Sequence, residues 1–234
     1  MRIPERYIIA PVDKETAQEL VVKHHYLHRR APCSASFGLY DKLQKDGLFE
    51  GRLVGVIMFG YPASRHLQKG ICGEDEADNV IELTRLWVED GTPRNTESYF
   101  VMGAIRKVRW EIIVAYSEPQ AGHLGLVYQA CSFLYTGLSD PHCEWELDGV
   151  PLTAHSRHRF DEWGGIEGAK KVLGDRLRKV QRPRKHRYIF FNTRCKRRRK
   201  ELLSKLRYPI LPYPKQQNFQ PYLKAGFPAS QKSL

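Results

Sequence analysis

VIELTRLWVEDGTPRNTES, residues 80–98, predicts a strand that runs through a turn into a helix. The first nine residues alternate as in a strand, with Ile81, Leu83, Arg85 and Trp87 on one face and Glu82, Thr84 and Leu86 on the other. Asn95 or Thr96 is the expected N-cap. Because the first backbone N–H groups of a helix bind anions, Asn95, Thr96 and Ser98 are candidates for holding a phosphate group. Ordinary capping explains Asn95 or Thr96 equally well, and the stretch has no Walker or Rossmann glycine pattern.

The rest of the chain continues this alternation of strands and helices. Strands are predicted over residues 7–11, 36–40, 52–60, 112–117 and 143–153, and helices over 13–27, 123–135 and a segment whose apolar stripe is Tyr99, Met102, Ile105 and Val108. The strands 36–40 and 52–60 flank a polar turn and predict a hairpin, whereas 61–79 is expected to be a surface loop. The predicted fold class is α/β or α+β, with a mixed central sheet flanked by helices.

Charge is divided unevenly along the chain. The sequence has 38 Lys and Arg against 26 Asp and Glu, a net charge of +12. Residues 1–150 hold 16 basic and 21 acidic residues, whereas 151–234 hold 22 basic and 5 acidic residues. Nearly all of the positive charge belongs to the last third, which indicates a polyanionic partner. We expect a catalytic core over 1–160 and a basic DNA-binding extension over 161–234 that packs on it, with its last residues disordered.

Composition and cysteine spacing limit the class of protein. A hydrophobic share of 41% is typical of a globular chain rather than a disordered one. No apolar run approaches the roughly 18 residues that span a bilayer, and the N-terminus has no signal-like apolar block. Five cysteines without a C-x-x-C pair argue against a disulfide framework and a structural zinc site. We therefore expect a soluble, intracellular protein with reduced thiols.

Two further stretches place polar side chains where open sheets bind ligands. IIVAYS, residues 112–117, predicts a buried strand, and Glu118 follows at its carboxyl end. Tyr128 lies early in the next helix, where its phenol can act as a proton donor or pack as an aromatic ring. KHHYLHRR, residues 23–30, supplies three histidines that can bind a metal, donate protons, contact phosphate or form a solvated basic face. One of them with Glu82 or Glu118 would approach the ligand set of a non-haem iron site.

The basic clusters of the last third can act without fine geometry. RLRKVQRPRKHR, residues 176–187, and RCKRRRK, residues 194–200, are the densest. Each Lys or Arg that neutralises a phosphate releases counterions, so such clusters favour nucleic-acid binding over a merely solvated face. The candidate nucleic-acid-binding residues are Arg184, Lys185, Arg187, Lys196, Arg197, Arg198 and Arg199.

Several motifs together resemble a known family. The order of elements resembles the GNAT acyl-CoA transferase fold, and a more specific set resembles the bacteriophage Mom family of DNA-modification proteins. That set is HHYLHRR, SFGLY, GVIMFG, IELTRLWV, PRNTESYF, IVAYSEPQAGHLGLVYQA and HRYIFF, and the resemblance covers about residues 12–215. It implies a phage enzyme, acting in the cytoplasm of an infected bacterium, that uses acetyl-CoA to convert adenine in double-stranded DNA to N6-carbamoylmethyladenine. The modification protects the DNA from host restriction endonucleases.

The resemblance also implies where the site lies. It places His25, Tyr26, Arg85, Ser98, Glu118 and Tyr128 in the active site. Adenine N6 joins the former methyl carbon of the acetyl group, so a C–H bond must be activated, which implies iron with His25 and Glu118 as ligands. Tyr128 or Glu82 is expected beside them. Arg85 and Ser98 are assigned to the CoA phosphates or the acyl carbonyl, and Asn95 and Thr96 to the phosphates. GTPRNTES replaces the usual GNAT glycine-rich loop, and Glu118 stands where the family is expected to carry aspartate.

Two other functions fit the same residues. A GNAT N-acetyltransferase that acts on an RNA or protein amine needs the CoA site but no metal. A non-enzymatic nucleic-acid-binding protein needs only the basic third. A duplex hides adenine N6 in its major groove, so a modification enzyme is expected to extrude the base. No membrane partner is expected, and the oligomeric state is left open, with a homodimer as one form.

Overall fold

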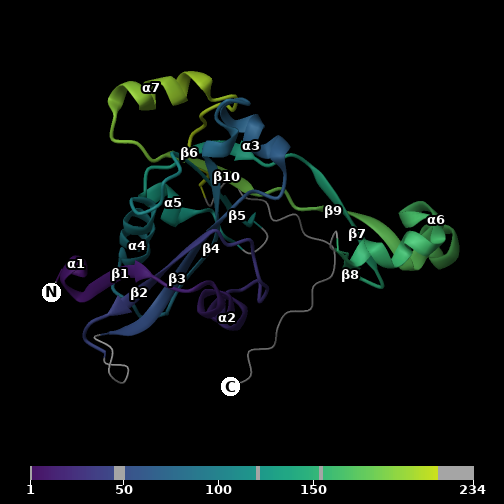
Figure 1. The fold of residues 1–234 in the computed structure, drawn as a ribbon, viewed down its shortest axis with the longest axis horizontal. Helices are drawn as coiled ribbons and strands as arrows, with labels where there is room; N and C mark the ends of the chain where they lie inside the picture. The colour runs from purple at the N-terminus through teal and green to yellow at the C-terminus, as the bar shows by residue number, and fades with distance from the viewer. Residues whose placement is uncertain (1, 45–50, 120–121, 153–154, 216–234) are drawn as a thin grey trace.

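The computed structural model describes residues 2–44, 51–119, 122–152 and 155–215. Within them, the main sheet has the strand order β1-β2-β3-β4-β5-β10-β6, and a smaller sheet has the order β8-β7-β9 (Figure 1). The strands are β1 Tyr7–Pro11, β2 Ala35–Asp41, β3 Arg52–Gly60, β4 Val80–Val88, β5 Ile112–Ser117, β6 Leu134–Leu138, β7 His142–Leu147, β8 Val150–Pro151, β9 Leu177–Arg182 and β10 His186–Phe191. The α-helices are α1 Ile3–Arg6, α2 Lys14–His24, α3 Arg65–Cys72, α4 Thr96–Ile105, α5 Leu126–Ala130, α6 Gly165–Leu173 and α7 Lys196–Lys205. The 3-10 segments are η1 Ala77–Asn79, η3 His155–Trp163 and η4 Gly174–Arg176.

The register of the main sheet makes it mixed. β1 to β4 pair antiparallel, β4 and β5 pair parallel, and β10 runs antiparallel to both β5 and β6. A parallel pair needs a crossover, which α4 supplies between β4 and β5. The predicted class, a mixed central sheet flanked by helices, is confirmed.

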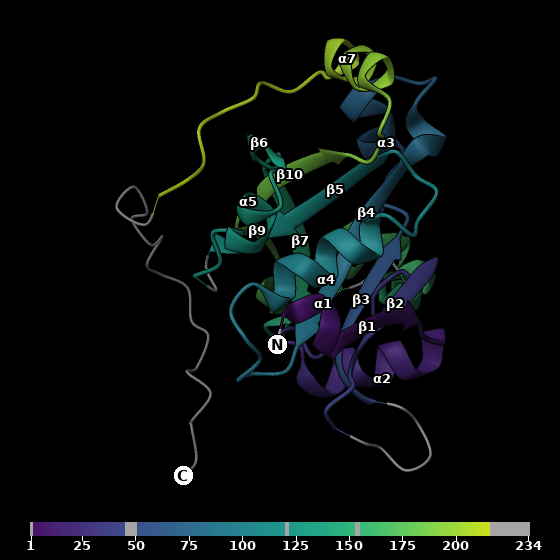
Figure 2. The same ribbon diagram turned by 90° about the vertical axis from the view of Figure 1, so that its left-hand side faces the viewer.

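Helices cover both faces of the sheet. Phe100 and Ala104 of α4 pack in the largest core cluster, on one face. The other face buries Val21 of α2 and, farther along the sheet, Ile71 of α3 and Leu202 of α7. Successive residues of β3, β4 and β5 alternate between these clusters, as a pleated strand requires. Figure 2 shows α3 and α7 together at one end of the molecule, away from α1 and α2.

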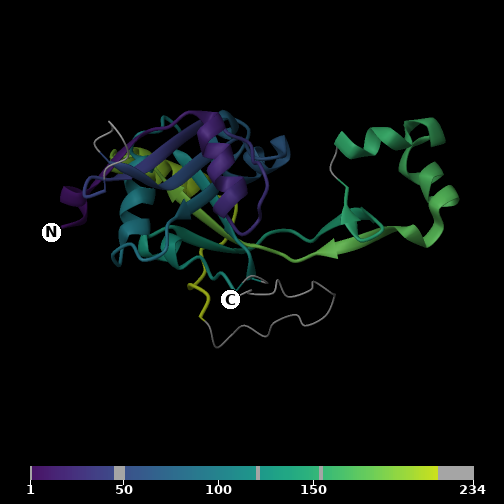
Figure 3. The same ribbon diagram turned by 90° about the horizontal axis from the view of Figure 1, so that it is seen from below.

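Strands β6 and β10 are neighbours in the sheet but are separated by a long insertion. β10 lies between β5 and β6, although it comes from the basic part of the chain that was expected to form an extension. The insertion, residues 142–182, is called the lobe below, and its own core contains Leu152, Phe160, Ala169 and Leu177. Figures 1 and 3 show that the lobe extends away from the main sheet, with β7 and β9 forming the part nearest to the sheet. The last third therefore completes the sheet as well as carrying basic side chains.

Most of the predicted elements are confirmed. The hairpin of β2 and β3 is present, Asp13 caps α2 by accepting from the N–H of Thr16, and Asn95 is the N-cap of α4. The five cysteines are free in the structure. One detail of α4 differs from the prediction, because the helix ends at Ile105 and leaves Val108 beyond its apolar stripe.

Three predicted elements are wrong. The strand predicted over residues 143–153 is two antiparallel strands, β7 and β8, because Asp148 and Gly149 adopt positive φ and form a turn between them. Residues 61–79 are not a loop alone, because Ser64 caps helix α3 with its hydroxyl and η1 follows. The helix predicted over 123–135 is only α5, because Ser132 adopts a left-handed conformation with φ of 58° and ends it. The apolar residues that continue the helical pattern form β6 instead, where they pair with β10.

The described part of the C-terminal tail runs beside β6. The N–H of Leu211 donates to the carbonyl of Tyr135 at 2.9 Å, and the hydroxyl of Tyr213 donates to that of Phe133 at 2.8 Å. The tail residues expected to be disordered lie outside the described residues. No helix in the described ranges is long and apolar enough to cross a membrane.

Candidate active site

Strands β4 and β5 part at their carboxyl ends. They pair in parallel from Val80 with Ile112 to Leu83 with Ala115, and the pairing stops there although both strands continue. The backbone of a sheet separates the side chains of its two faces, so groups from opposite faces can meet where strands part. The carboxyl ends of parallel strands are also where open sheets bind ligands.

A β-bulge in β4 sets the direction of two candidate side chains. The pairing of β4 with β3 skips Thr84, so that Arg85 faces Met58 and lies on the same face as Glu82. Strict alternation predicts opposite faces for Glu82 and Arg85, and that prediction is wrong because the extra residue shifts the register. The hydroxyl of Thr84 lies 3.0 Å from the carbonyl of Pro32 and 3.2 Å from that of Met58, which stabilises the bulge.

A chain of aromatic rings positions the end of α2 beside this face. The ring of His24 stacks on Trp87 of β4 with centroids 4.5 Å apart, and His25 stacks on Tyr26 at 4.3 Å. Tyr26 in turn contacts His123, which follows β5, at 5.0 Å. These contacts join α2, β4 and the segment after β5, and they place His25 and Tyr26 where the two strands part.

His25 is a neutral side chain with a defined tautomer. It is 9% exposed, and burial, followed by the charges of Arg85 and His123, lowers its pKa from 6.5 to about 4. Its Nδ1 accepts a hydrogen bond from the backbone N–H of Leu27 at 3.1 Å. A neutral imidazole has one N–H and one lone pair, so the proton lies on Nε2. His25 can therefore donate a hydrogen bond to a substrate oxygen at neutral pH.

Glu82 combines burial with a lack of hydrogen bonds. Burial raises its pKa from 4.5 to about 7, although the positive charges of Lys185 and Arg85 oppose the shift. Burial also raises the pKa of the Tyr116 and Tyr128 hydroxyls, and the nearby Glu82 adds to both shifts. No group among the described residues donates a hydrogen bond to the carboxylate of Glu82. A carboxyl group with a pKa near 7 is suited to general acid–base catalysis at neutral pH.

Helix α5 carries Tyr128 toward the same point from the opposite face. Gly125 precedes α5 with φ of 70°, and a Cβ there would lie 2.5 Å from the ring of Tyr188. The close approach lets Tyr128 pack against Tyr188 with ring centroids 5.4 Å apart. The hydroxyl of Tyr128 has no hydrogen-bond partner in the described part of the chain, and, after burial, the charges of Tyr26 and Glu82 contribute most to its raised pKa. Tyr128 thus packs as a core ring and also presents an unpaired hydroxyl to the site.

Glu118 is paired with a lysine from the basic third. Its carboxylate lies 3.2 Å from the Nζ of Lys185. The register of β10 explains this pair, because His186 faces Ser117 and the adjacent residues continue the alignment. Sequence analysis did not identify Lys185 as a residue of this site, because nothing in the sequence of β5 or of β10 indicates the register in which the two strands pair. The charge of Glu118 also contributes, after burial, to the raised pKa of Tyr26.

These side chains do not fit an iron ion. No three His, Cys, Asp or Glu side chains in the described ranges are close enough together to hold a metal. His25 has no lone pair left for a metal, because Nδ1 accepts from Leu27 and Nε2 carries the proton. The charges that act on His25 are cationic, led by Arg85, and Glu118 is occupied by Lys185. The surroundings suit an anion or a carbonyl oxygen better than a second cation.

Arg85 belongs to this central group. One of its terminal nitrogens donates to the carbonyl of Thr84 at 2.6 Å, while its buried Nε has no partner among the residues that the structure describes. Burial and the charge of Arg29 lower its pKa, and Tyr26 and Glu82 oppose that shift. The unpaired Nε–H is available to a carbonyl or phosphate oxygen of a ligand.

The start of α4 offers a separate set of donors. The backbone N–H groups of Glu97 and Ser98 have no acceptor within the described residues. The hydroxyls of Thr96 and Ser98 donate to the carbonyls of Pro93 and Asn95, at 2.7 and 3.0 Å. An anion at this helix start would therefore be held by backbone N–H groups and the helix dipole rather than by those hydroxyl protons.

The candidate residues thus form two groups. The central group contains His25, Tyr26, Glu82, Arg85, Glu118 and Tyr128, and the helix-start group contains Asn95, Thr96 and Ser98. The Sγ of Cys131 lies 3.6 Å from the carbonyl oxygen of Ser98, which ties the end of α5 to the start of α4. The helix that carries Tyr128 therefore connects the two groups.

Three of the candidate nucleic-acid-binding residues are held by internal contacts. Arg187 is buried, donates to the hydroxyl and carbonyl of Thr136, and lies over the ring of Tyr208 at 3.5 Å. Arg198 forms ion pairs with Glu76 and other acids. Lys185 pairs with Glu118, as described above.

The other four are open to a partner. Arg184 is exposed and donates to the main chain of Ser139, and no acid among the described residues pairs with its charge. Lys196, Arg197 and Arg199 lie in the first turn of α7 and make no ion pair within the described ranges. α7 follows the end of β10 that pairs with the start of β5, so these three residues lie at the opposite end of the sheet from Glu118.

A family model and a curated relative match this chain. The model of the Mom protein family matches residues 6–215. The methylcarbamoylase mom of Escherichia phage Mu is 33% identical over 178 residues, which cover 72% of this chain and 70% of the relative.

Solved structures of similar architecture are more distant. NAA60 from Arabidopsis thaliana, in complex with acetyl-CoA, aligns over 79% of this chain and 98% of its own with 11% identity and a TM-score of 0.44. The yncA protein of Salmonella typhimurium, with its cofactor acetyl-CoA, aligns over 82% of this chain and 96% of its own with 11% identity and a TM-score of 0.42.

Proposed function

The chain belongs to the Mom protein family, and we propose on that basis that it converts adenine in double-stranded DNA to N6-carbamoylmethyladenine with acetyl-CoA. The name of the phage Mu relative, a methylcarbamoylase, supports this class of product. The observation that carries the proposal is the meeting of His25, Glu82, Arg85 and Tyr128 where β4 and β5 part. Donors for a carbonyl oxygen and an acceptor for a proton are thereby brought to one place.

The start of α4 is the proposed site for the CoA pyrophosphate. The N–H groups of Glu97 and Ser98 face no internal acceptor among the described residues, and the helix dipole adds positive potential. The contact of Cys131 with Ser98 joins this helix start to α5, so the proposed phosphate site and Tyr128 lie on adjoining elements.

The central group supplies several of the groups that the transfer needs. Adenine N6 replaces a hydrogen of the acetyl methyl carbon and loses a proton, and Glu82, with its pKa near 7, is the proposed acceptor of that proton. This replacement removes two electrons and the methyl hydrogen, which an external oxidant takes up, and an ammonia nitrogen displaces CoA as its thiol to form the amide. The Nε2–H of His25 and the Nε–H of Arg85 are the proposed donors to the acyl carbonyl oxygen. Tyr128 is the proposed donor of a proton to the departing CoA sulfur, because its hydroxyl makes no hydrogen bond within the described chain and interacts electrostatically with Glu82.

The target base has to leave the duplex to reach these groups. Enzymes that act on a base extrude it into a pocket and hold the backbone with cations. Arg184, Lys196, Arg197 and Arg199 are the proposed phosphate contacts, because they are free of acids within the described ranges. The proposed setting is the cytoplasm of an infected bacterium, where the modification protects phage DNA from restriction.

Mass spectrometry of nucleosides tests the proposal. DNA from bacterial cells that express the protein should contain an adenosine heavier by one carbamoylmethyl group. Tyr128→Phe should abolish that nucleoside while duplex binding is retained, because the ring still packs on Tyr188. Unmodified DNA from wild-type cells would contradict the proposal. An N6-acetylated adenosine would instead assign plain acetyl transfer.

A further inference from the structure

The lobe emerges beside the candidate active site. The last residue of β6, Leu138, faces His186 at the start of β10. Beyond that pair, the N–H of Ser139 donates to the carbonyl of Lys185 at 2.7 Å, and the N–H of Lys185 lies 3.0 Å from the hydroxyl oxygen of Ser139. Lys185 itself pairs with Glu118. The base of the lobe is therefore attached to a residue of the central group.

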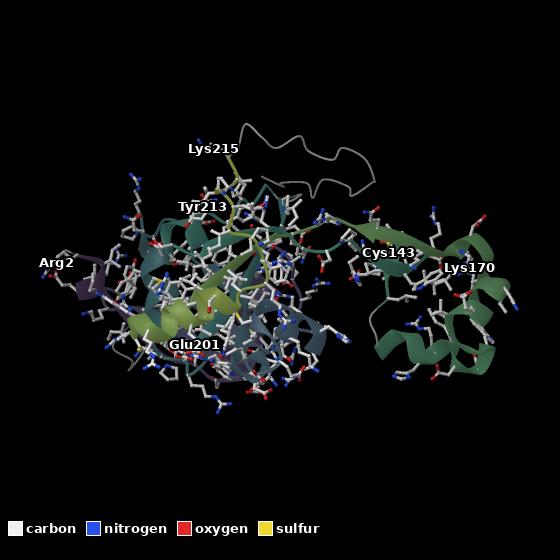
Figure 4. All side chains as sticks on the ribbon, turned by 90° about the horizontal axis from the view of Figure 1, so that it is seen from above. Arg2, Cys143, Lys170, Glu201, Tyr213 and Lys215 are labelled. Carbon is white, nitrogen blue, oxygen red and sulfur yellow. The ribbon has the colours of Figure 1, made fainter. Side chains whose placement is uncertain are left out.

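Within the lobe, β7 and β9 form a two-stranded ribbon that connects the main sheet to the rest of the lobe. They pair antiparallel from His142 with Arg182 to Leu147 with Leu177. Six residues of strand extend about 20 Å, which is about the length of six base pairs. The ribbon is anchored at its far end by the core of the lobe, where Trp145 and Leu147 pack. Figure 4 shows the lobe, with Cys143 and Lys170 labelled, apart from α7, where Glu201 is labelled.

The ribbon has an excess of unpaired positive charge. Its two acids, Glu144 and Glu146, are both bound by Arg182, at 2.8 and 2.9 Å. The remaining cations of β9, Arg178 and Lys179, are exposed and have no acid partner in the described part of the chain. Arg184 adds a third such cation at the base of the ribbon. Arg184 lies at the base of the ribbon, whereas Arg178 and Lys179 lie farther out and, as successive strand residues, on its opposite faces.

We infer that the β7–β9 ribbon is an arm that binds the phosphates of duplex DNA flanking the target adenine, through Arg178, Lys179 and Arg184. The inference rests on the proposed function for the identity of the target base. Duplex DNA fits because its major groove admits a two-stranded ribbon about 20 Å long, and cations on both faces of that ribbon can then reach phosphates on both sides of the groove. The arm would hold the duplex while the extruded base reaches the central group.

Charge reversal on the ribbon tests the inference. The double variant Arg178→Glu/Lys179→Glu should lower duplex affinity and reduce the slope of log affinity against log salt by about 2, because each phosphate contact contributes about 0.9. Acetyl-CoA binding should not change. The matched control is Lys14→Glu/Lys42→Glu, which reverses two exposed cations beside β1 and β2, at the edge of the sheet opposite to β10, the lobe and α7. An equal loss of affinity and slope in both variants would overturn the inference.

Removal of the whole arm is the second test. Leu138 and His186 face one another, so an Asn-Gly turn in place of residues 140–184 can close β6 and β10 as a hairpin. This variant should bind acetyl-CoA but lose most of its affinity for duplex DNA and most of its modification activity. If it fails to fold, the charge-reversal pair decides the question. Full duplex affinity in the folded deletion variant would overturn the inference.

The two proposals fail in different ways. If wild-type protein binds duplex DNA through the arm but leaves its adenines unmodified, the arm stands and the proposed function fails. If wild-type protein modifies adenine and the arm variants modify it equally well, at subsaturating DNA and physiological salt, the proposed function stands and the arm fails.

Discussion

The Nδ1 of His25 accepts the backbone N–H of Leu27 at 3.1 Å, and this one contact determines what the imidazole offers to a ligand. With Nδ1 occupied, the neutral ring presents an N–H at Nε2 and no lone pair. The histidine is therefore a donor for an oxygen atom. Addition of a chelator should accordingly leave the thermal stability of the protein and its affinity for duplex DNA unchanged.

The pKa of His25 predicts a pH dependence of stability. Its folded-state pKa is about 4, below its ordinary value of 6.5, so between these values the unfolded state binds more protons. The free energy of unfolding should therefore fall as the pH is lowered from 6.5 to 4, by at most about 3 kcal/mol. His25→Gln should remove this part of the dependence in urea titrations. An NMR-measured pKa near 6.5 for His25 would contradict the prediction.

Glu82→Gln should separate stability from activity. The folded-state pKa of Glu82 is about 7, above its ordinary value of 4.5, so its ionisation makes the fold less stable as the pH rises from 4.5 to 7. The variant should be more stable than wild type at pH 8, by about 1–3 kcal/mol. It should also lose about 10²–10⁴-fold in modification rate, and wild-type activity should rise with pH through 7. Wild-type activity that is flat from pH 6 to 8 would count against Glu82 as the base.

Arg187 and Arg197 should respond in opposite ways to alanine substitution. Arg187→Ala removes hydrogen bonds to Thr136 and the contact with Tyr208 inside the protein, so it should destabilise the fold by about 3 kcal/mol. Arg197→Ala changes an exposed side chain and should alter stability by less than about 0.5 kcal/mol while it weakens duplex binding. Thermal unfolding and salt-dependent binding distinguish the two.

Glu76 should stabilise the packing of α7 against the rest of the protein. It pairs with Arg198 and Lys205, each at 2.6 Å, and the Arg198 hydrogen bond is the main cause that lowers its pKa from 4.5 to about 2. Its contribution is complete above its ordinary pKa of 4.5 and is lost as the pH falls through 2. Glu76→Gln should destabilise the protein at pH 7 by about 2 kcal/mol. Hydrogen exchange should localise the loss to α7, and protection of α7 equal to wild type would contradict this role.

Sequence analysis identified most of the strands, because their apolar and polar residues alternate locally. It did not predict α3, since the helix has only eight residues and its three buried residues include the polar Gln68. It extended α5 into β6, because the apolar residues after Ser132 continue the helical spacing and the partner strand β10 lies far along the chain.

The sequence indicated which residues belong to the candidate site, but it did not indicate how their side chains are arranged in space. Glu82, Arg85, Glu118 and Tyr128 stand out from the sequence by their positions at strand ends and by the family motifs. Their mutual geometry depends on the bulge at Thr84 and on the register of β10, and neither has a local signal. The pairing of Glu118 with Lys185 could not be predicted either, because it also depends on the register of β10.

The position of β10 between β5 and β6 affects how the protein is made. Until residues 186–191 leave the ribosome, β5 and β6 each keep an unpaired edge, and unpaired edges promote association between chains. The lobe precedes β10 in the chain and has its own apolar core, so it can fold first and bring β10 close to the gap. A chain that stops short of β10 would remain an aggregation-prone fragment, so activity requires that β10 has been made and has paired with β5 and β6.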